Sequence, residues 1–351
     1  MSPEDISLQF DLPSSKVKLF PLGKGLINDT YLLDPIETSC NNRFVLQRIN
    51  KIVFTEPEKL MQNLIKINQH LTSKKARYQE LVKSTQGQLF YIDDIGDYWR
   101  VTKYLENTIT LYAVPNPEVA YEAARTYGNF LYDLHDLEVS EIQETIPGFH
   151  NYKNRTLQLQ KSIKTNYRNR IIKCRQEIDD INKRLRYIDA FYDLGLPLRV
   201  IHSDTKIDNI LFDADTLKGR LVIDLDISMP GSILYDFGDM IRSFTNTLKE
   251  DDPNLNAIEV KMDIFEQISR GFLESTSSFI LEKERNNLVL GAKVIILIQA
   301  IRNLTDYLNG DIYYKTDYED HNLHRAQNQL TLVAAVERHE DQLLRLISKY
   351  I

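Results

Sequence analysis

The chain has 351 residues, a formal net charge of −7, and 42% hydrophobic and 26% charged residues. This length and composition predict a folded globular protein with room for two modest domains rather than a disordered chain. The acidic balance argues against broad contact with nucleic acid, because phosphates are bound by a basic surface.

Three further features indicate a soluble cytoplasmic protein. Cys40 and Cys174 have no pairing pattern or metal-ligand spacing around them, as expected in a reducing compartment. The acidic N-terminal segment lacks the apolar core of a signal peptide. The longest purely aliphatic run, residues 294–298, is far too short to span a bilayer. We therefore expect no membrane or nucleic-acid partner, and a monomer by default.

The first hundred residues have the pattern of a small antiparallel sheet with one helix. Residues 17–23 and 29–34 flank a short glycine loop as strands, and residues 43–50 follow as a third. A helix is expected over residues 56–74, where leucine and isoleucine recur on one face. Residues 88–106 then form two strands around a turn at Gly96.

From about residue 117 the pattern becomes helical. Pro117 is placed to start one helix, and a long charged helix is expected over residues 155–194, ending at Gly195 and Pro197. A strand-rich island covers residues 199–226, and residues 236–351 are mostly helical. We predict an α+β, bilobal protein-kinase-like fold. Residues 1–105 would form a nucleotide-binding lobe, and residues 106–351 a helical lobe with a catalytic hairpin.

The island begins with "HSDTKIDN" at residues 202–209, which carries a carboxylate, a lysine and an amide at short spacing. In phosphoryl transfer the protein supplies mainly positioning and charge neutralisation. Asp204 is predicted to accept the proton of the attacking hydroxyl, and Lys206 to shield the γ-phosphate. Asn209 is predicted to bind Mg²⁺ through its amide oxygen. These roles imply ATP and Mg²⁺ as cofactors.

A hairpin is expected to bring a second carboxylate to this loop. Centring its turn on residues 216 and 217 places Ile210 opposite Ile223, and Asn209 opposite Asp224. Asp226 would project from the same strand face as Asp224 and reach a second ion. The sequence therefore predicts a metal site formed by Asn209, Asp224 and Asp226.

The tripeptide "DFG" at residues 236–238 resembles the metal-binding signature of protein kinases. Pro230 and Gly231 are expected to break the preceding strand, and a helix begins near Asp236. An aspartate at a helix start more often caps the helix or braces a neighbouring loop than binds a metal. We therefore expect Asp236 to brace the catalytic loop, and His202 to brace it as well.

The glycine loop and the strand after it are expected to hold the nucleotide phosphates. Gly23 and Gly25 would cover the phosphates with backbone N–H groups, and Asn28 would anchor the turn. The strand "FVLQRIN" carries no lysine, so Arg48 is the best candidate for the α/β-phosphate cation. Glu58 would be its partner.

The segment "TKYLE" at residues 102–106 closes the small lobe. It is the natural hinge whose backbone would meet adenine, which makes Tyr104 and Leu105 candidate nucleotide contacts.

Together these motifs resemble the aminoglycoside phosphotransferase and choline kinase superfamily. A narrower resemblance, to the bacterial N-acetylhexosamine 1-kinases, rests on seven blocks in consistent order over about residues 23–330. They read "GLINDTY", "FVLQRIN", "ETIPGFH", "HSDTKIDN", "VIDLDISMPG", "YDFGDMIR" and "LTDYLNGDIYYK…HNLHRAQNQL". The chain departs from this family at Leu26 in the glycine loop, where a polar residue is expected.

This resemblance implies transfer of the ATP γ-phosphoryl group to the anomeric hydroxyl of GlcNAc or GalNAc, with Asp204 as base and Mg²⁺ on Asn209 and Asp224. Arg302 and Tyr313 fall where the family's sugar contacts lie, and Phe244 is a nearby aromatic.

Two alternatives stay open from the residues alone. One is another small-alcohol kinase of the same fold, acting on choline, an aminoglycoside, methylthioribose or homoserine. The other is a pseudokinase that binds nucleotide without turnover, although the presence of all the catalytic side chains argues against it. The choice between GlcNAc and GalNAc also stays open.

Overall fold

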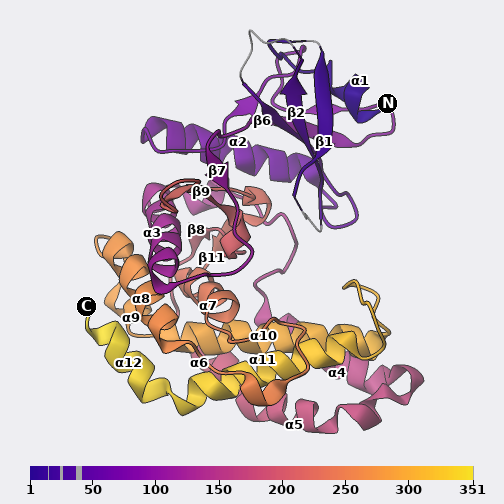
Figure 1. The fold of residues 1–351 in the computed structure, drawn as a ribbon. Helices are drawn as coiled ribbons and strands as arrows, with labels where there is room; N and C mark the ends of the chain where they lie inside the picture. Colours follow the sequence, from indigo (N-terminus) through magenta and orange to yellow (C-terminus); the bar gives the residue numbers. More distant parts are fainter. Residues whose placement is uncertain (15, 24–26, 37–41, 351) are drawn as a thin grey trace.

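The computed structural model describes residues 1–14, 16–23, 27–36 and 42–350. A lobe built on a β-sheet lies at one end, and a larger helical lobe lies at the other (Figure 1). The predicted α+β fold with a small antiparallel sheet and a mainly helical second part is thus confirmed.

The small lobe is an antiparallel sheet with helices on its two faces. Within the described residues its order is β1-β2-β3-β6-β4, with β5 paired to β6. The strands are β1 (Val17–Pro21), β2 (Asp29–Pro35), β3 (Phe44–Arg48), β4 (Leu81–Val82), β5 (Tyr91–Ile92) and β6 (Tyr98–Lys103). Side chains alternate along each strand. Phe44 and Leu46 therefore join Leu33 and Val101 in a small core that Ile6 of α1 (Pro3–Ser7) completes.

The helix α2 (Pro57–Ser73) agrees with its predicted range and packs toward the helical lobe. Its buried residues Leu60, Leu64 and Ile67 belong to the main core rather than to the small one. The sheet therefore has a closed face, which holds the small core, and a second face that looks toward the rest of the molecule.

The catalytic segment lies between the two lobes (Figure 1). There β7 (Thr108–Ile109), β9 (Ile210–Asp213) and β10 (Gly219–Val222) form a sheet in the order β10-β9-β7. A second pair joins β8 (Arg199–Ile201) to β11 (Met229–Gly231). Pro230 and Gly231, predicted to break a strand, instead form the middle and end of β11.

The hairpin register differs from the prediction by one residue. Ile210 pairs with Val222, and the Ile223 amide donates to the Asn209 carbonyl at 2.9 Å. The turn is set by Asp213, whose Oδ1 accepts from the Thr216 amide at 3.0 Å, and a register shift follows Gly219. Asn209 and the segment that begins at residue 223 still meet at the same end of the hairpin.

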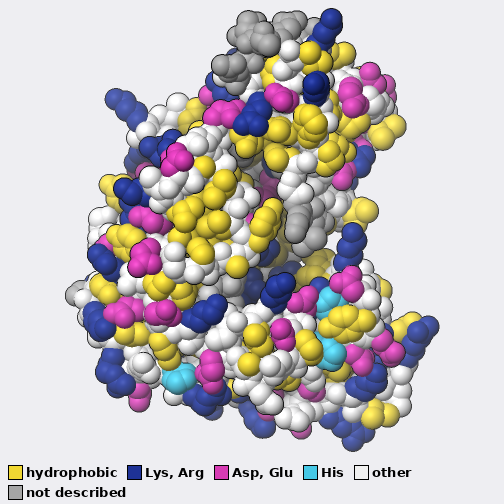
Figure 2. Space-filling model, viewed as in Figure 1, with side chains coloured by type: hydrophobic (Ala, Val, Ile, Leu, Met, Phe, Trp, Pro, Cys, Tyr) yellow, Lys and Arg dark blue, Asp and Glu magenta, His cyan; other side chains and the backbone are white. Residues whose placement is uncertain are grey.

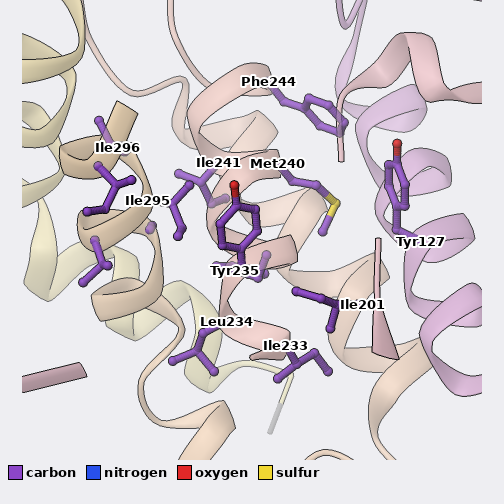
Figure 3. Packing of buried hydrophobic residues seen from close by; sticks show 14 of the residues in the cluster. Tyr127, Ile201, Ile233, Leu234, Tyr235, Met240, Ile241, Phe244, Ile295 and Ile296 are labelled. Carbon is purple, nitrogen blue, oxygen red and sulfur yellow. The ribbon is translucent and has the colours of Figure 1, made fainter. Parts of the chain in front are cut away.

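The helical lobe is arranged around α7 (Ile233–Phe244) and α10 (Leu288–Asn309). Figure 3 shows apolar side chains of α7 lying between those of α10 and Tyr127 of α3 (Pro117–Leu134). The other helices are α4 (Tyr152–Thr165), α5 (Arg175–Arg184), α6 (Arg186–Asp193), α8 (Met262–Thr276), α9 (Glu282–Arg285), α11 (His321–Arg338) and α12 (Glu340–Ser348).

Two glycines let α7 and α10 meet at the backbone. A Cβ on Gly238 would lie 2.8 Å from the Gly291 carbonyl oxygen, and one on Gly291 would lie 2.8 Å from the Leu234 carbonyl oxygen. Any side chain at either position would therefore separate the helices. The glycine of the "DFG" tripeptide thus has a packing role.

The long helix predicted over residues 155–194 is wrong, because the chain bends within it. Asn166, Arg168 and Asn169 have φ of 44°, 48° and 59°, in the left-handed region that a regular helix excludes. Three helices, α4, α5 and α6, replace the single one, with a short 3₁₀ segment (Tyr167–Lys173) between α4 and α5.

The helix α10 is apolar and long enough to cross a membrane by length and composition. Seventy-eight per cent of its most apolar window is buried inside the protein. This is the pattern of a core helix, and Figure 1 shows α10 running through the helical lobe.

Candidate active site

The catalytic loop places its charged groups together. Lys206 Nζ lies 2.9 Å from one carboxylate oxygen of Asp204 and 3.1 Å from the other. Burial by itself would raise the pKa of Asp204, but the Lys206 ammonium lowers it below its ordinary value. Asp204 is therefore an ionised acceptor at neutral pH, as a proton acceptor for an alcohol must be.

Asp236 holds this loop from the first turns of α7. Its Oδ2 accepts from the His202 amide and its Oδ1 from the Ser203 amide, both at 2.8 Å. Its carbonyl accepts from Thr205 Oγ1 at 2.7 Å. The prediction that Asp236 braces the loop is confirmed, although Ser232, not Asp236, caps the helix.

His202 braces the loop from within. Its Nε2 lies 2.9 Å from the Ile223 carbonyl, and its Nδ1 accepts from the Asp204 amide at 3.2 Å. The ring is fully buried beside Tyr127 and Phe130, and burial lowers its pKa. A neutral His202 therefore ties the catalytic loop to the segment that carries Asp224.

The oxygen atoms of Asn209 and Asp224 are suited to a magnesium ion. Asn209 Nδ2 donates to the Asp204 carbonyl at 2.9 Å, which leaves its Oδ1 to face a cation. Asp224 is exposed to solvent. Figure 2 shows that the surface is hollowed between the two lobes. The surrounding protein, with the charges of Asp226 and Asp204, nevertheless raises the pKa of Asp224 to about 7. A carboxylate placed against other carboxylates is a setting that a divalent cation would relieve.

Within the described part of the chain, no three carboxylate, histidine or cysteine side chains gather as a complete metal site. Asp226, predicted to hold a second ion, is instead engaged by two donors. Arg100 Nη1 lies 2.5 Å from its Oδ1, and Asn28 Nδ2 lies 2.6 Å from its Oδ2. Asp226 also lies in a 3₁₀ turn (Leu225–Ile227), not on a strand, so it does not share a strand face with Asp224.

Arg48 does not have the surroundings of a phosphate-binding cation. It pairs with Asp29 and Asp97, and its side chain is 43% exposed. Glu58, its predicted partner, is exposed and makes none of these contacts. The prediction rested on Arg48 sharing a face with Leu46, but Leu46 points into the small core, away from the helical lobe.

The glycine loop is described in part. Gly23 has φ of 75°, a left-handed conformation that favours glycine, whereas Gly25 and Leu26 lie outside the described residues. Asn28 anchors the end of the loop as predicted, since its Oδ1 accepts from the Asn50 amide at 3.0 Å.

The predicted hinge segment lies between β6 and β7. The Tyr104 amide donates to the Arg43 carbonyl at 3.0 Å, and the Leu105 carbonyl accepts from Thr108 Oγ1 at 2.6 Å. Tyr104 and Leu105 are both partly exposed there, so their role as adenine contacts stays a prediction.

A second group of side chains lies next to the catalytic loop on the helical side. His150 Nε2 lies 3.0 Å from Ser203 Oγ, and Ser203 directly precedes Asp204 in the chain. The Arg302 guanidinium lies 5.4 Å from the ring centre of Phe149 and 5.7 Å from that of Tyr314. Contacts thus lead from the catalytic loop to the predicted acceptor residue Arg302.

The two other predicted acceptor residues, Tyr313 and Phe244, differ in their exposure to solvent. Tyr313 is 62% exposed and packs edge-on against Tyr314, with ring centres 4.8 Å apart. Phe244 is 2% exposed and belongs to the main core, as Figure 3 shows, so it does not offer an open ring to a ligand.

The region around Arg302 carries positive charge, and no carboxylate of the described residues pairs with its two arginines, Arg155 and Arg302. Among the described residues, Arg302 donates to Gln299, and Arg155 donates to Gln158. Burial and the nearby charge of Arg302 lower the pKa of Arg155. Burial, Arg155 and Arg302 likewise lower the pKa of His150 to about 3, so this histidine is neutral.

The sequence did not point to Arg100, His150, Arg155 or Tyr314. A signal existed for Arg100, because an arginine between Trp99 and Val101 in an apolar strand must find a buried partner. No comparable signal marked the others, since they lie in polar or aromatic segments whose approach to the loop depends on tertiary packing.

Comparisons with known proteins identify the family of the chain. The phosphotransferase enzyme family matches residues 18–258. Homoserine kinase of Zymomonas mobilis is 49% identical over 41 residues, which are 12% of this chain and only 13% of that protein.

Two solved structures share the fold over nearly the whole chain. A microcompartment-associated aminopropanol kinase has a TM-score of 0.60 at 16% identity and covers 98% of both chains. An amicoumacin kinase in complex with AMP-PNP, Ca²⁺ and Ami has a TM-score of 0.63 at 10% identity over 93% of this chain and 91% of that one. With the family matched over more than half of its length, the chain belongs to the phosphotransferase enzyme family.

Proposed function

We propose that this kinase transfers the γ-phosphoryl group of ATP to the anomeric hydroxyl of an N-acetylhexosamine, GlcNAc or GalNAc. Asp204 accepts the proton of that hydroxyl. Lys206, whose Nζ lies 2.9 Å from the Asp204 carboxylate, shields the charge of the transferred phosphoryl group. The observation that supports this acceptor most is the pair of arginines on the acceptor side, which have no carboxylate partner among the described residues.

The charge of that surface argues against a cationic acceptor. Choline, ethanolamine and aminoglycosides carry ammonium groups that need carboxylates or an aromatic cage. Arg302 and Arg155 would repel such groups, and the neutral His150 adds no negative charge. The hydroxyl and amide oxygens of a sugar can accept hydrogen bonds from both guanidinium groups, and Tyr314 offers a ring for its apolar face.

We propose Mg²⁺-ATP as the phosphoryl donor. The oxygens of Asn209 and Asp224 would hold the ion, which neutralises charge on the phosphates when it is bound. The complex of the amicoumacin kinase with AMP-PNP and Ca²⁺ supports a nucleotide and a divalent cation in this fold. His202 and Asp236 keep Asp204 and Asn209 in place for that ligand.

An acceptor panel tests the proposal. Purified protein with Mg²⁺-ATP should release ADP with GlcNAc or GalNAc and not with choline or an aminoglycoside. The 1-O-methyl glycoside of the active sugar is the matched control, because its anomeric oxygen carries no proton and should give no turnover. Turnover of choline or an aminoglycoside, with none of either sugar, would overturn the proposal.

A substitution tests the role of the acceptor arginine. Arg302→Ala should raise the KM for the sugar by about 10- to 100-fold, because the sugar loses a charged hydrogen-bond donor. The KM for ATP should stay unchanged, because Arg302 does not contact the nucleotide. Arg270→Ala is the control, since Arg270 pairs with Glu274 on the exposed face of α8. An unchanged KM for the sugar would remove Arg302 from the acceptor site.

Homoserine is the second candidate. The local identity with a homoserine kinase favours it, and its carboxylate would suit Arg302 and Arg155. Its ammonium group would still need an acidic partner beside those arginines. Turnover of homoserine without turnover of the sugars would decide for this candidate.

A further inference from the structure

A kinase of this architecture needs a cation at the α- and β-phosphates, and in protein kinases a lysine on the third strand supplies it. Here β3 carries Gln47 on the face that looks toward the helical lobe, and Arg48 is held by Asp29 and Asp97. The third strand therefore provides no such cation, although the activity requires one.

Arg100 occupies the matching place on the adjacent strand. It pairs directly with Gln47 across the β3–β6 ladder, and its Nε donates to Gln47 Oε1 at 2.9 Å. Its side chain is 4% exposed, so this charge is built into the protein rather than carried on the surface. Because Leu46 and Val101 face the small core, Gln47 and Arg100 face the helical lobe.

The guanidinium lies where three distant segments meet. Arg100 comes from the sheet, Asp226 follows the candidate metal ligand Asp224, and Asn28 ends the glycine loop. In protein kinases the glycine loop covers the nucleotide phosphates and the metal ligands hold the ions that bridge them, so Arg100 lies beside two segments with those roles. The position is therefore that of a phosphate-binding cation and not only of a structural ion pair.

The contacts leave part of the guanidinium available. Among the described residues, Arg100 Nε donates to Gln47 and Arg100 Nη1 to Asp226, and no described residue accepts a hydrogen bond from Nη2. An arginine fork presents five donors, and a phosphate oxygen suits those that remain.

We propose that Arg100 binds the α/β-phosphate oxygens of the nucleotide in place of a strand lysine, with Gln47 and Asp226 as the positioning residues that aim it. Asp226 then contributes to phosphate binding by positioning Arg100, whereas Asn209 and Asp224 bind the metal ion. The inference rests on the kinase activity and not on the identity of the acceptor.

Nucleotide binding without acceptor tests it. Arg100→Ala should weaken the binding of ATP and of ADP, measured by calorimetry, by about 10- to 100-fold, because a charged hydrogen-bond donor is lost. The affinity for adenosine should stay within about two-fold, since adenosine has no phosphate. A purely structural role would instead weaken all three ligands together.

Arg48→Ala is the matched control, because it removes the neighbouring arginine of the same sheet. It should leave the affinity for ATP within about two-fold of the wild type. If Arg48→Ala weakens ATP as strongly as Arg100→Ala, or if Arg100→Ala binds ATP normally, the assignment is overturned.

Two further variants keep the test decisive if Arg100→Ala fails to fold. The double variant Arg100→Gln/Asp226→Asn removes both buried charges and keeps polar contact, so it should fold and still lose affinity for ATP and ADP. Adding Gln47→Lys to Arg100→Gln returns a cation to the third strand and should recover most of that affinity. Normal ATP binding by the folded double variant would refute the proposal, and so would a folded Gln47→Lys/Arg100→Gln variant that recovers no affinity.

Discussion

The catalytic loop and the Arg100 junction (Asn28, Gln47, Arg100 and Asp226) hold their charged groups in different ways. The loop is fixed through its backbone, because Asp236 accepts two loop amides, and His202 bonds a third amide and a carbonyl. The junction is made largely of side chains and joins both lobes. Backbone anchoring suits a base that must keep one position, whereas side-chain contacts between lobes suit a group that binds and releases a nucleotide.

The largest effect should come from the catalytic base. Asp204→Ala should lower kcat by about 10³-fold, since general-base catalysis is lost. The affinity for ATP, measured without acceptor, should stay close to that of the wild type. Asp215→Asn, at an exposed acid on the hairpin turn, is the control. Turnover unchanged in Asp204→Ala would show that the base is another group.

Removing the brace should have the next largest effect. Asp236→Ala leaves two buried loop amides without an acceptor, which should cost about 2–4 kcal/mol of unfolding free energy. Displacement of the loop should also lower kcat by about 10²-fold. Denaturant unfolding and steady-state kinetics measure the two effects. A stable variant with normal kcat would contradict the anchoring described for the loop.

A change in the Arg100 junction should alter the affinity for ATP rather than kcat. Asp226→Asn keeps the size of the side chain but removes the charge that aims Arg100, so the affinity for ATP should weaken by about 10-fold. At saturating ATP, kcat should stay within about three-fold of the wild type. A large loss of kcat with normal ATP affinity would place Asp226 with the catalytic loop and remove the distinction between the two regions.

The smallest effect is a pH dependence on the loop side. The folded protein keeps His150 neutral, with a pKa of about 3, whereas the unfolded chain binds a proton near pH 6.5. Below that pH the unfolded state binds more protons, so this residue's contribution to stability falls as pH decreases.

The comparison of wild type with His150→Gln isolates this contribution. Between pH 7.5 and pH 5, the wild type should lose about 1–2 kcal/mol more unfolding free energy than the variant. Parallel curves for the two proteins, from denaturant titrations at each pH, would show that His150 is protonated in the folded state.

The sequence predicted the catalytic loop well because its groups are local. Asp204, Lys206 and Asn209 lie within one octapeptide, and the hairpin after it could be recognised from its turn. The register differs by one residue from the prediction that centred the turn on residues 216 and 217, and in the turn Asp213 Oδ1 accepts from the Thr216 amide. Local chemistry was therefore sufficient for the fold class and for the prediction that Asp204, Lys206 and Asn209 lie together.

The junction could not be predicted in the same way. Alternation along β3 shows that Gln47 and Arg48 point to opposite faces, but not which face looks toward the nucleotide. That is decided by which residues fill the small core, and thus by packing between segments far apart in the sequence. The break in the helix predicted over residues 155–194 could not be predicted either, because the residues with left-handed backbone conformation there are not glycines.

The backbone contact between α7 and α10, made at Gly238 and Gly291, has a mechanical consequence. Asp236, which holds the catalytic loop, lies on α7, and Arg302, the proposed acceptor contact, lies on α10, so the close packing of these helices ties the two positions together. Motion at the hinge around residues 104–107 would then carry the nucleotide lobe toward or away from these helices without disturbing the base–acceptor alignment. ATP and ADP could exchange while the acceptor stays aimed at Asp204.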